Sequence, residues 1–442
     1  MEQVASLKTV GSVITLSEQA QIQDTEIIEY IRNLNLDLSE TEYEGIPKYL
    51  GINYDLWTSY YIGIEWLKKG DKAIAVLPKV PNIDFNKMFV EVLSFAPASD
   101  YFNKFYGIRI NEPLILYPQA NAILTPLMIT HYLYVMKKLI KHGLINDYVT
   151  KEENLKGKVK GKICISRHVS HNIIPHREEY TMCRYQELTK DIPINRLLKR
   201  ALKFSIRALS FIPSKDMFKV QTELRKCVSK FEGVSDNVEL HSVRNLKYNK
   251  LFMYYKEAIP LAKLILKRYD NSIDNISETS KTPPFWIDMS RLYEVYVYSK
   301  FYDKYGEGIK FQVPGHYNTA ADFVIPSQNL IIDTKYKPRY ENGNRGMLDD
   351  IREISGYARD TLITRGMDKD KEPDCLIIYP FTHDDNAPDI EDTLKFDPQQ
   401  DLIKDSTSIN GFRGFYKIAV ELPLIIKEIK EQENTVRENT NQ

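Results

Sequence analysis

The chain has 442 residues, with 60 lysines and arginines and 60 acidic residues, and its formal net charge is therefore zero at neutral pH. This length predicts two to four domains, each large enough to bury its own core. The balanced charge neither favours nor excludes a nucleic-acid partner. No apolar run approaches the roughly 20 residues that a membrane-spanning helix needs, so we expect no membrane association.

The four cysteines are scattered and form no Cys-x-x-Cys pair: Cys164, Cys183, Cys227 and Cys375. This spacing argues against a zinc site and against a disulfide framework. It is typical of a protein in a reducing compartment. The first residues also lack the basic-then-apolar pattern of a secretory signal. We therefore expect a cytoplasmic protein.

Residues 1–145 read as a β-rich N-terminal domain with helical cover. Apolar periodicity predicts helices at 24–36, 85–95 and 124–142. Gly143 is a suitable residue to end the last of them. A strand is expected at 72–80, where Pro78 places its end at an edge or turn, and shorter strands are expected at 4–15 and 114–117.

Residues 146–275 read as a basic, mainly helical middle domain, with helices expected at 194–209, 218–231 and 251–269. Residues 151–210 carry a local excess of eight positive charges in an otherwise neutral chain. Such an excess is typical of a surface that contacts DNA phosphates. A solvated hairpin with lysines on its open face explains the lysines at the start of this stretch equally well. The candidate DNA-binding residues here are Lys158, Lys160, Lys162, Arg196 and Arg200.

Three histidines of the middle region raise the question of a metal site: His168, His171 and His176. Their spacing does not match a common ligand set, and no acidic residue lies among them. We interpret them as polar loop residues.

A polar stretch at 272–281 and the pair Pro283-Pro284 predict a linker before a third domain, which we place at 276–425. This domain is expected to contain a helix within 287–299, a strand at 331–336, a helix at 347–359, and strands at 376–380 and 415–420. Residues 426–442 are charged and rich in amides, and we expect a flexible tail.

The third domain contains one acid followed by a turn and a buried-looking strand that ends in Asp-x-Lys. Asp322 precedes the turn at 326–329, and Asp333 and Lys335 follow the apolar run 330–332. Residues two apart share a face of a strand, so Asp333 and Lys335 are expected to lie together, with Asp322 joining them from the neighbouring strand. Carboxylates that hold Mg²⁺ and a nearby cation are what phosphodiester hydrolysis needs.

Chance is an alternative explanation, because Asp-x-Lys occurs in many chains and a surface strand can carry a simple acid–lysine pair. Glu294 supports the catalytic interpretation. It falls inside the apolar pattern of the preceding helix, and a carboxylate buried there requires a partner.

Residues 285–340 resemble the core of the PD-(D/E)xK nuclease superfamily, with a helix that carries Glu, a strand that carries Asp, and a strand that carries Asp-x-Lys. The segments at 285–294 and 333–337 are similar to the McrC family, the nuclease subunits of McrBC-type, modification-dependent (5-methylcytosine) restriction systems. More diffuse similarity to this family covers 63–67, 75–80, 88–89, 155–157 and 194–198. The resemblance implies an α/β (α+β multidomain) protein whose C-terminal domain has a restriction-endonuclease-like mixed sheet flanked by helices.

Charge suggests a role for each residue of this core. We expect Asp322 and Asp333 to bind Mg²⁺, with the backbone carbonyl of Thr334 as a third ligand. Lys335 would contact the attacking water or the transition-state phosphate, and Glu294 would complete the acid cluster.

Neighbouring residues have less specific expectations. Lys337 either touches a DNA phosphate or is a surface lysine, and Asp288 is expected to cap the helix that follows it. The resemblance places a Gln and a Tyr on the later helix, where this chain has Glu353 and Tyr357. Glu353 is therefore either an additional acid beside the metal or a partner of a neighbouring residue. The family has a proline before the first acid, and this chain has Ala321 there. That proline shapes a turn and takes no part in the chemistry.

The resemblance implies a Mg²⁺-dependent endodeoxyribonuclease that cleaves double-stranded, methylated DNA. It also implies docking of residues 1–145 on a ring-forming AAA+ GTPase of McrB type, which activates the nuclease and is stimulated by it. The chain contains no Gly-x-x-x-x-Gly-Lys-Ser/Thr, so a nucleotide-hydrolysing motor must be another chain. The alternatives are a non-catalytic adaptor that binds such a partner or DNA, and a stand-alone repair nuclease of the same superfamily.

Overall fold

The computed structural model describes residues 13–39, 47–80, 82–95, 102–109, 112–117, 121–210, 212, 215–238, 253–270, 281–337, 345–381 and 401–424. The chain divides into two compact units, of which the first combines Met1–Ile123 with Lys281–Gln442 and the second is Leu124–Ser280. The boundaries expected after residues 145 and 275 differ from this division. Most of the predicted linker, the predicted tail and much of the strand expected at 4–15 lie outside the described residues.

The first unit contains a five-stranded sheet in the order β1-β3-β2-β10-β4. Its strands are β1 (Val13–Ser17), β2 (Tyr61–Lys68), β3 (Lys72–Leu77), β4 (Tyr106–Ile108) and β10 (Phe285–Asp288). The same part of the chain also contains helices α1 (Thr25–Asn33), α2 (Phe85–Ser94) and the short α3 (Phe102–Phe105). Asp24 caps α1 through its carboxylate, and Ile27 and Ile31 bury the apolar face of that helix against the sheet.

Strand β10 is a correction to the expected domain limits, because it belongs to the N-terminal sheet although the sequence placed it in the third domain. It pairs antiparallel with β2 on one side and with β4 on the other. Gly63 of β2 makes this pairing possible, since a Cβ atom there would lie 2.1 Å from the Phe285 carbonyl oxygen. No local sequence signal predicts this pairing, because it joins residues more than 200 positions apart.

A second sheet in the first unit has six strands in the order β11-β12-β13-β14-β16-β15. They are β11 (Lys310–Pro314), β12 (Ala320–Ile325), β13 (Leu330–Thr334), β14 (Asp374–Phe381), β15 (Thr407–Ser408) and β16 (Phe415–Glu421). Strands β13, β14 and β16 are parallel, whereas β11, β12 and β15 run antiparallel to their neighbours. The central strands are buried along almost their whole length, as their continuous apolar sequences predict.

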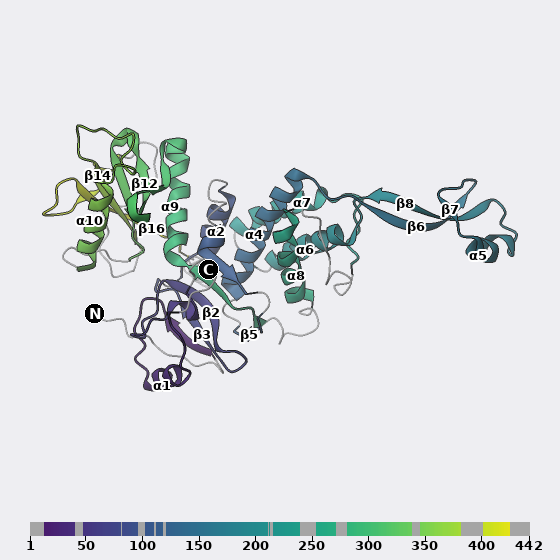
Figure 1. Ribbon diagram of the computed structural model, residues 1–442, viewed down its shortest axis with the longest axis horizontal. Coiled ribbons are helices and arrows are strands. Elements are labelled where there is room, and N and C mark those ends of the chain that lie inside the picture. Colours follow the sequence, from purple (N-terminus) through teal and green to yellow (C-terminus); the bar gives the residue numbers. More distant parts are fainter. Residues whose placement is uncertain are drawn as a thin grey trace, which may run out of the picture. The chain divides into compact units, whose positions relative to one another are not determined.

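Helices α9 (Met289–Tyr305) and α10 (Arg345–Tyr357) lie on either side of this sheet (Figure 1). Successive residues of β12 show why, because they point to opposite faces. Phe323 packs against Tyr298 and Phe301 of α9, and Val324 belongs to the core that includes Ile351 and Ile354 of α10. The two sheets and their helices make a mixed α/β protein, as expected.

The described part of the second unit is built mainly on helices α4 (Asn121–His142), α6 (Pro193–Leu209), α7 (Lys215–Ser229) and α8 (Tyr255–Asp270). Helix α4 starts just before the limit between the units. Buried Leu197, Leu198, Ala201 and Leu202 form the inner face of α6. The expected helices of this region agree with α6, α7 and α8 within a few residues, and Gly143 follows α4 with a positive φ of 94°.

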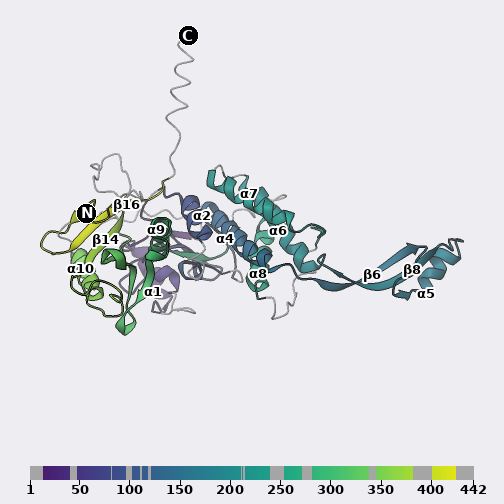
Figure 2. The ribbon, with the colours of Figure 1, turned by 90° about the horizontal axis from the view of Figure 1, so that it is seen from above.

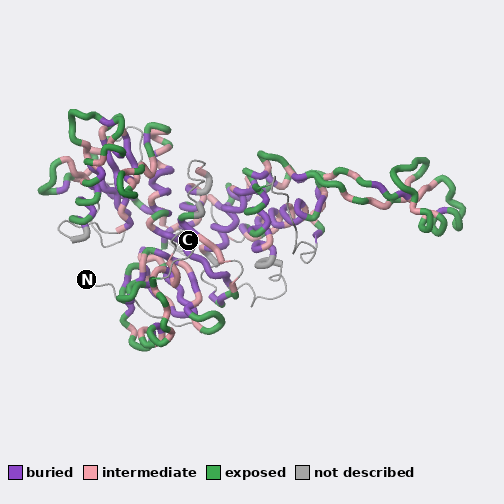
Figure 3. Tube along the Cα trace, in the orientation of Figure 1, coloured by how far each residue is buried: buried purple, intermediate pink, exposed green. Residues whose placement is uncertain are grey.

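A long hairpin of β6 (Asp147–Lys156) and β8 (Tyr180–Thr189) extends from the helices of this unit, with the short β7 (Lys162–Ile163) beside β8 (Figures 1 and 2). Ten residue pairs join β6 to β8. Figure 3 shows that the hairpin is mostly exposed or half-buried, whereas the helices of the unit are largely buried. The expectation of a mainly helical region therefore omitted a three-stranded sheet.

The tip of the hairpin corrects the interpretation of the histidines. His168 ends α5 (Ile165–His168) and His171 lies in the π-helical turn Val169–Ile173, so these two are helical and not loop residues.

No helix among the described residues is long and apolar enough to cross a membrane. One small sheet of the first unit remains, in which β5 (Ile115–Leu116) pairs antiparallel with β9 (Lys281–Thr282).

Candidate nuclease site

Strands β12 and β13 bring two aspartates to one end of the second sheet. Phe323 pairs with Ile332, and the same antiparallel register, continued by one residue, places Asp322 opposite Asp333. The backbone nitrogen and the hydroxyl of Thr334 both donate to Asp322 Oδ2, each at 2.7 Å. Asp333 is buried and Asp322 is half-buried.

Lys335 follows β13 directly and lies between two carboxylates. Its Nζ is 2.8 Å from Asp333 Oδ2 and 2.8 Å from Glu353 Oε2 of α10. Burial opposes the charged form of Lys335, but these two carboxylates outweigh it and raise the pKa of the ammonium group. Lys335 is thus a fixed cation at the end of the strand, where the Asp-x-Lys spacing predicted it.

Glu353 acts as the partner of neighbouring groups in this structure. Burial alone would raise the pKa of its carboxyl group, but the hydrogen bonds from Lys335 and from the Tyr357 hydroxyl, the latter at 2.7 Å, bring that pKa below its usual value. Arg352, the residue directly before Glu353, pairs instead with Asp349 at 3.0 Å. Glu353 thus has neighbouring partners, and a role beside the metal stays a prediction.

Glu294 reaches the site from α9, where it is half-buried and accepts a hydrogen bond from Gln312 Nε2 of β11. Burial, and then the nearby Asp322 carboxylate, raise the pKa of Glu294 well above its usual range. Gln312 was not among the candidate residues. Its φ of 50° lies in the left-handed region, which no local sequence signal predicts for a glutamine in a strand.

Burial raises the pKa of each of the three acids; Lys335 opposes this effect for Asp322 and Asp333, and the hydrogen bond from Gln312 opposes it for Glu294. The pKa of Asp322 is raised by burial against the opposing hydrogen bonds from Thr334. The pKa of Asp333 is raised well above its usual range by burial and by the charge of Asp322, with Lys335 opposing. With all three acids ionised, one lysine would leave the cluster with an excess of negative charge, which a bound cation would offset.

The donor chemistry of the cluster suits a hard divalent cation such as Mg²⁺, which prefers carboxylate and carbonyl oxygens. Asp333 Oδ2 is buried and accepts no hydrogen bond of good geometry, although Lys335 lies close to it. Among the described residues, no group of three or more His, Cys, Asp or Glu side chains is arranged to hold a metal ion. The oxygens that fit best are those of Asp322, Asp333 and the Thr334 carbonyl, and the three-acid arrangement is not preformed.

Two residues beside the cluster have structural partners. Lys337 Nζ lies 2.8 and 2.9 Å from the two carboxylate oxygens of Asp350 on α10, a buried acid that the sequence did not single out. Asp288 caps α9, as expected, by accepting a hydrogen bond from the backbone nitrogen of Arg291 at 3.0 Å.

The remaining candidate DNA-binding residues lie in the second unit, whereas the acid cluster lies in the first. Lys158, Lys160 and Lys162 are exposed near the turn between β6 and β7. Lys160 covers the ring of Tyr185 at 3.9 Å and lies 3.6 Å from Glu187. These lysines remain available to an anionic partner.

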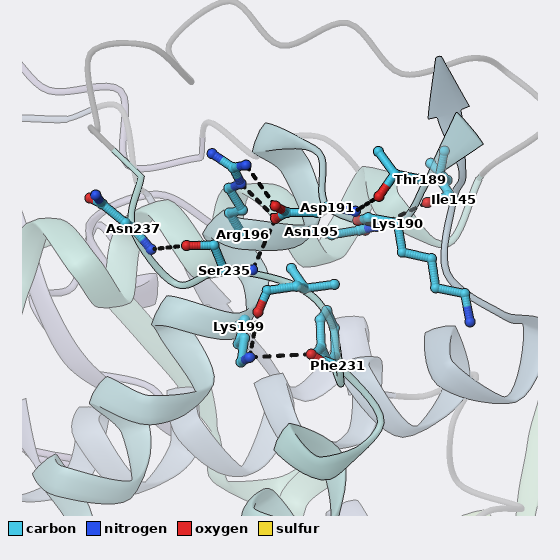
Figure 4. A network of polar contacts seen from close by, with 11 residues as sticks. Ile145, Thr189, Lys190, Asp191, Asn195, Arg196, Lys199, Phe231, Ser235 and Asn237 are labelled. Atoms are coloured by element: carbon cyan, nitrogen blue, oxygen red, sulfur yellow. Dashed lines mark hydrogen bonds and ion pairs between the residues drawn. The ribbon is translucent and has the colours of Figure 1, made fainter. Parts of the chain in front are cut away.

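Arg196 is instead part of an internal network of the second unit (Figure 4), and Arg200 also bonds within this unit. Arg196 donates from Nε and Nη2 to the two carboxylate oxygens of Asp191 at 2.6 and 2.7 Å. The Ser235 backbone nitrogen also donates to Asp191, at 2.9 Å. Arg200 donates to the Val238 carbonyl. The role of both arginines in DNA binding stays a prediction, and their observed contacts stabilise the loop after α7.

The fold and the cluster define a mixed α/β protein with acids and a lysine at the ends of adjacent strands. A family model described as "McrBC 5-methylcytosine restriction system component" matches residues 56–354, and the chain belongs to this family. This confirms the resemblance to McrBC-type restriction systems that the sequence motifs indicated.

Two solved structures from Thermococcus gammatolerans are similar to the chain. One, described as a refined half-complex from a tetradecameric assembly of McrB AAA+ hexamers with bound McrC, is 15% identical, with a TM-score of 0.40, and the match covers 97% of this chain and 99% of that chain. The other, the McrBC complex, is 16% identical, with a TM-score of 0.31, and the match covers 65% and 87%. A search of curated proteins finds no match.

Proposed function

We propose that this chain is the DNA-cleaving subunit of its restriction system, a Mg²⁺-dependent endodeoxyribonuclease with a PD-(D/E)xK site. The observation that carries the proposal is the convergence of Asp322, Asp333, Glu294 and Lys335, from α9, β12 and the end of β13, in a member of the McrBC family. A buried cluster of acids with raised pKa values is costly for folding alone. Such clusters occur where charge is needed for chemistry.

Asp322, Asp333 and the Thr334 carbonyl would hold the Mg²⁺ ion. When bound, it would act as a Lewis acid on the scissile phosphate and on the attacking water. Lys335 keeps its charge through Asp333 and Glu353 and would stabilise the negative charge that develops on the phosphate oxygens as the phosphorus–oxygen ester bond breaks. Glu294, held by Gln312, would accept a proton or complete the acidic shell.

The substrate and partner follow from the family. We propose that the chain acts on double-stranded DNA that carries 5-methylcytosine, because the family is described by that modification. We also propose that an AAA+ GTPase ring of McrB type activates the nuclease and is in turn stimulated by it. The chain has no P-loop of its own, so GTP hydrolysis must come from such a partner.

A non-catalytic adaptor is the second candidate, and one observation favours it. Glu294 and Asp322 already accept hydrogen bonds from Gln312 and Thr334, Asp333 is paired with Lys335, and the described residues contain no preformed three-acid metal site. An adaptor would bind the AAA+ partner or DNA without cleavage. The intact Asp322, Asp333 and Lys335 favour the nuclease.

The test is plasmid cleavage by the chain together with its McrB-type partner, in the presence of Mg²⁺ and GTP, on methylated and unmethylated DNA. The variant Asp333→Asn keeps the side-chain shape but removes the metal-binding charge, and we expect cleavage to fall at least about a hundredfold. Asp349→Asn is the matched control, since Asp349 is an exposed aspartate on α10 that pairs with Arg352.

Each outcome separates the candidates. Cleavage that needs the partner and is lost only in Asp333→Asn supports the nuclease and its site. A stable complex that never cleaves, on either DNA, favours the adaptor. Unchanged cleavage by Asp333→Asn would show that the active site lies elsewhere.

A further inference from the structure

Tyr336, the residue directly after the Asp-x-Lys motif, is tied to the N-terminal sheet by Lys79. Lys79 Nζ donates to the Tyr336 carbonyl oxygen at 2.9 Å, across 257 positions of sequence. The same ammonium group lies 4.3 Å from the centroid of the Tyr336 ring. Tyr336 is buried. One cation therefore holds both the backbone and the side chain of this residue.

Lys79 is itself fixed by the ends of two parallel strands, β1 and β3. Its backbone nitrogen donates to Glu18 Oε1 at 3.1 Å, and its Nζ donates to Gln19 Oε1 at 2.6 Å. Glu18 is fully buried, and its own backbone nitrogen donates to the Leu77 carbonyl at 2.9 Å. The position of the ammonium group is thus set by the N-terminal sheet, and it does not rotate freely as a surface lysine would.

Besides the ion pairs of Lys335 and Lys337, two backbone hydrogen bonds hold this part of the motif. The Lys335 backbone nitrogen donates to the Ile378 carbonyl at 2.8 Å, which extends the pairing of β13 with β14 by one residue. Beyond it, the Lys335 carbonyl accepts a local hydrogen bond from the Lys337 nitrogen, at 2.7 Å. The Tyr336 ring is 5.8 Å from that of Tyr293, the residue before Glu294. Tyr336 is therefore where the site meets the N-terminal sheet.

We infer that Lys79 is a positioning residue for the nuclease site, which fixes the peptide after Lys335 and so keeps Asp333, Thr334 and Lys335 in place. Lys79 touches none of the proposed reacting groups and acts only through Tyr336. The inference rests on the proposed function, and it makes the ends of β1 and β3 a route by which a change in the N-terminal sheet reaches the active site. Small displacements of catalytic groups are costly, because an error of about 1 Å can lower a rate roughly a hundredfold.

The test compares Lys79→Met and Lys79→Arg with a matched control, Lys72→Met. Lys72 belongs to the same strand region and also lies over a tyrosine ring, that of Tyr30, at 4.3 Å. We expect Lys79→Met to lower kcat by roughly tenfold or more, to raise the Mg²⁺ concentration needed for half-maximal cleavage, and to leave the KM for DNA unchanged. Lys79→Arg, which keeps a cationic donor, should recover most of the rate, and Lys72→Met should resemble the wild type.

A second readout does not depend on cleavage. Amide hydrogen exchange of residues 330–337 in the metal-free chain should be faster in Lys79→Met than in the wild type and in Lys72→Met. Wild-type kcat and exchange in Lys79→Met would overturn the inference. Equal effects of Lys79→Met and Lys72→Met would also overturn it, because they would indicate general weakening of the sheet.

If Lys79→Met does not fold, exchange of the wild-type chain in rising urea decides the question. The inference requires residues 335–337 to open together with the amides of Glu18 and Lys79, and separate opening would contradict it. Failure of the wild-type complex to cleave DNA would count against the proposed function alone, because the exchange experiment tests the Lys79 contact directly.

Discussion

At the scale of single residues, Glu353 decides how much freedom Lys335 has. Lys335 pairs with Asp333 and Glu353, and the Tyr357 hydroxyl holds the second oxygen of Glu353. Glu353 is nearly half exposed and lies at the surface end of this chain of contacts. It therefore orients the lysine and does not need to bind a metal.

We predict that Glu353→Gln cleaves DNA within about threefold of the wild type, since the amide oxygen can still accept from Lys335 and the amide NH2 group can donate to the Tyr357 hydroxyl oxygen. Glu353→Ala should lose about tenfold, because Lys335 then has one partner fewer. The measurement is the single-turnover cleavage rate of the complex. A loss in Glu353→Gln as large as that in Asp333→Asn would mean that Glu353 is a metal ligand.

Asp288 gives a pH-dependent prediction for stability. It is buried at the N-cap of α9, and burial raises its pKa to about 6, against about 3.9 in an unfolded chain. Because the folded-state pKa is raised, the protonated carboxyl group of Asp288 makes its full contribution to the free energy of unfolding below about pH 4. This contribution is lost as the pH rises through about 6. The shift corresponds to at most about 3 kcal/mol.

Asp288→Asn cannot titrate and keeps an acceptor at the N-cap. We therefore expect the free energy of unfolding of the variant, relative to the wild type, to rise by up to about 3 kcal/mol between pH 4 and pH 7. Urea unfolding at both pH values measures this difference, with Asp24→Asn at the N-cap of α1 as the control for exchanging a capping carboxylate. Parallel pH profiles for Asp288→Asn and the wild type would contradict the prediction.

At the scale of elements, the hairpin β6–β8 and helix α6 share the same basic stretch of sequence but use their charges differently. The lysines at 158, 160 and 162 are exposed on the hairpin. Arg196 on α6 is committed to Asp191. A positive sequence count alone does not distinguish a charge offered to solvent from one already neutralised.

We predict that the triple change Lys158→Ala, Lys160→Ala and Lys162→Ala weakens binding to double-stranded DNA. Each lysine–phosphate interaction that the variant no longer makes should reduce the slope of log affinity against log salt by about 0.9. Arg196→Gln should leave DNA affinity unchanged and instead lower stability by about 1 kcal/mol, because its ion pair with Asp191 is partly exposed. Fluorescence anisotropy across a salt series measures the DNA affinity of both variants. A loss of affinity in Arg196→Gln would show that Arg196 contributes to DNA binding.

At the scale of the whole molecule, the first unit is discontinuous, and the second unit is inserted into it. The insertion begins and ends near β5 and β9, which pair antiparallel with Leu116 opposite Lys281. The buried clusters around β3 and around β14 contain residues of the first unit alone. The first unit thus has the cores it needs for independent folding.

We predict that joining Leu116 to Lys281 through an Asn-Gly turn, which suits an antiparallel pair, yields a folded first unit. The three tryptophans, Trp57, Trp66 and Trp286, all belong to this unit, so their fluorescence reports on it alone. The emission spectrum should match that of the full chain. Gly63→Ala in the same background is the negative control, since a Cβ atom there meets the Phe285 carbonyl. An unfolded emission spectrum in the joined chain would contradict the prediction.

Sequence alone determined the features that depend on neighbours along the chain. Helical periodicity predicted α1, α2, α4, α6, α7 and α10 within a few residues, and the spacing of Asp322, Asp333 and Lys335 predicted which side chains lie together at the ends of β12 and β13. These features follow from 3.6-residue and two-residue repeats and from a single short turn.

Only the tertiary structure decided the rest. It placed β10 between β2 and β4, gave Glu294 the partner Gln312, neutralised Arg196 with Asp191, and brought Lys79 to Tyr336. Each of these contacts joins segments that are far apart in sequence and meet through the packing of sheets and helices. A local repeat in the sequence does not specify which distant segment a strand or side chain will contact. Local chemistry therefore predicted the acids and the lysine, whereas packing decided what holds them in place.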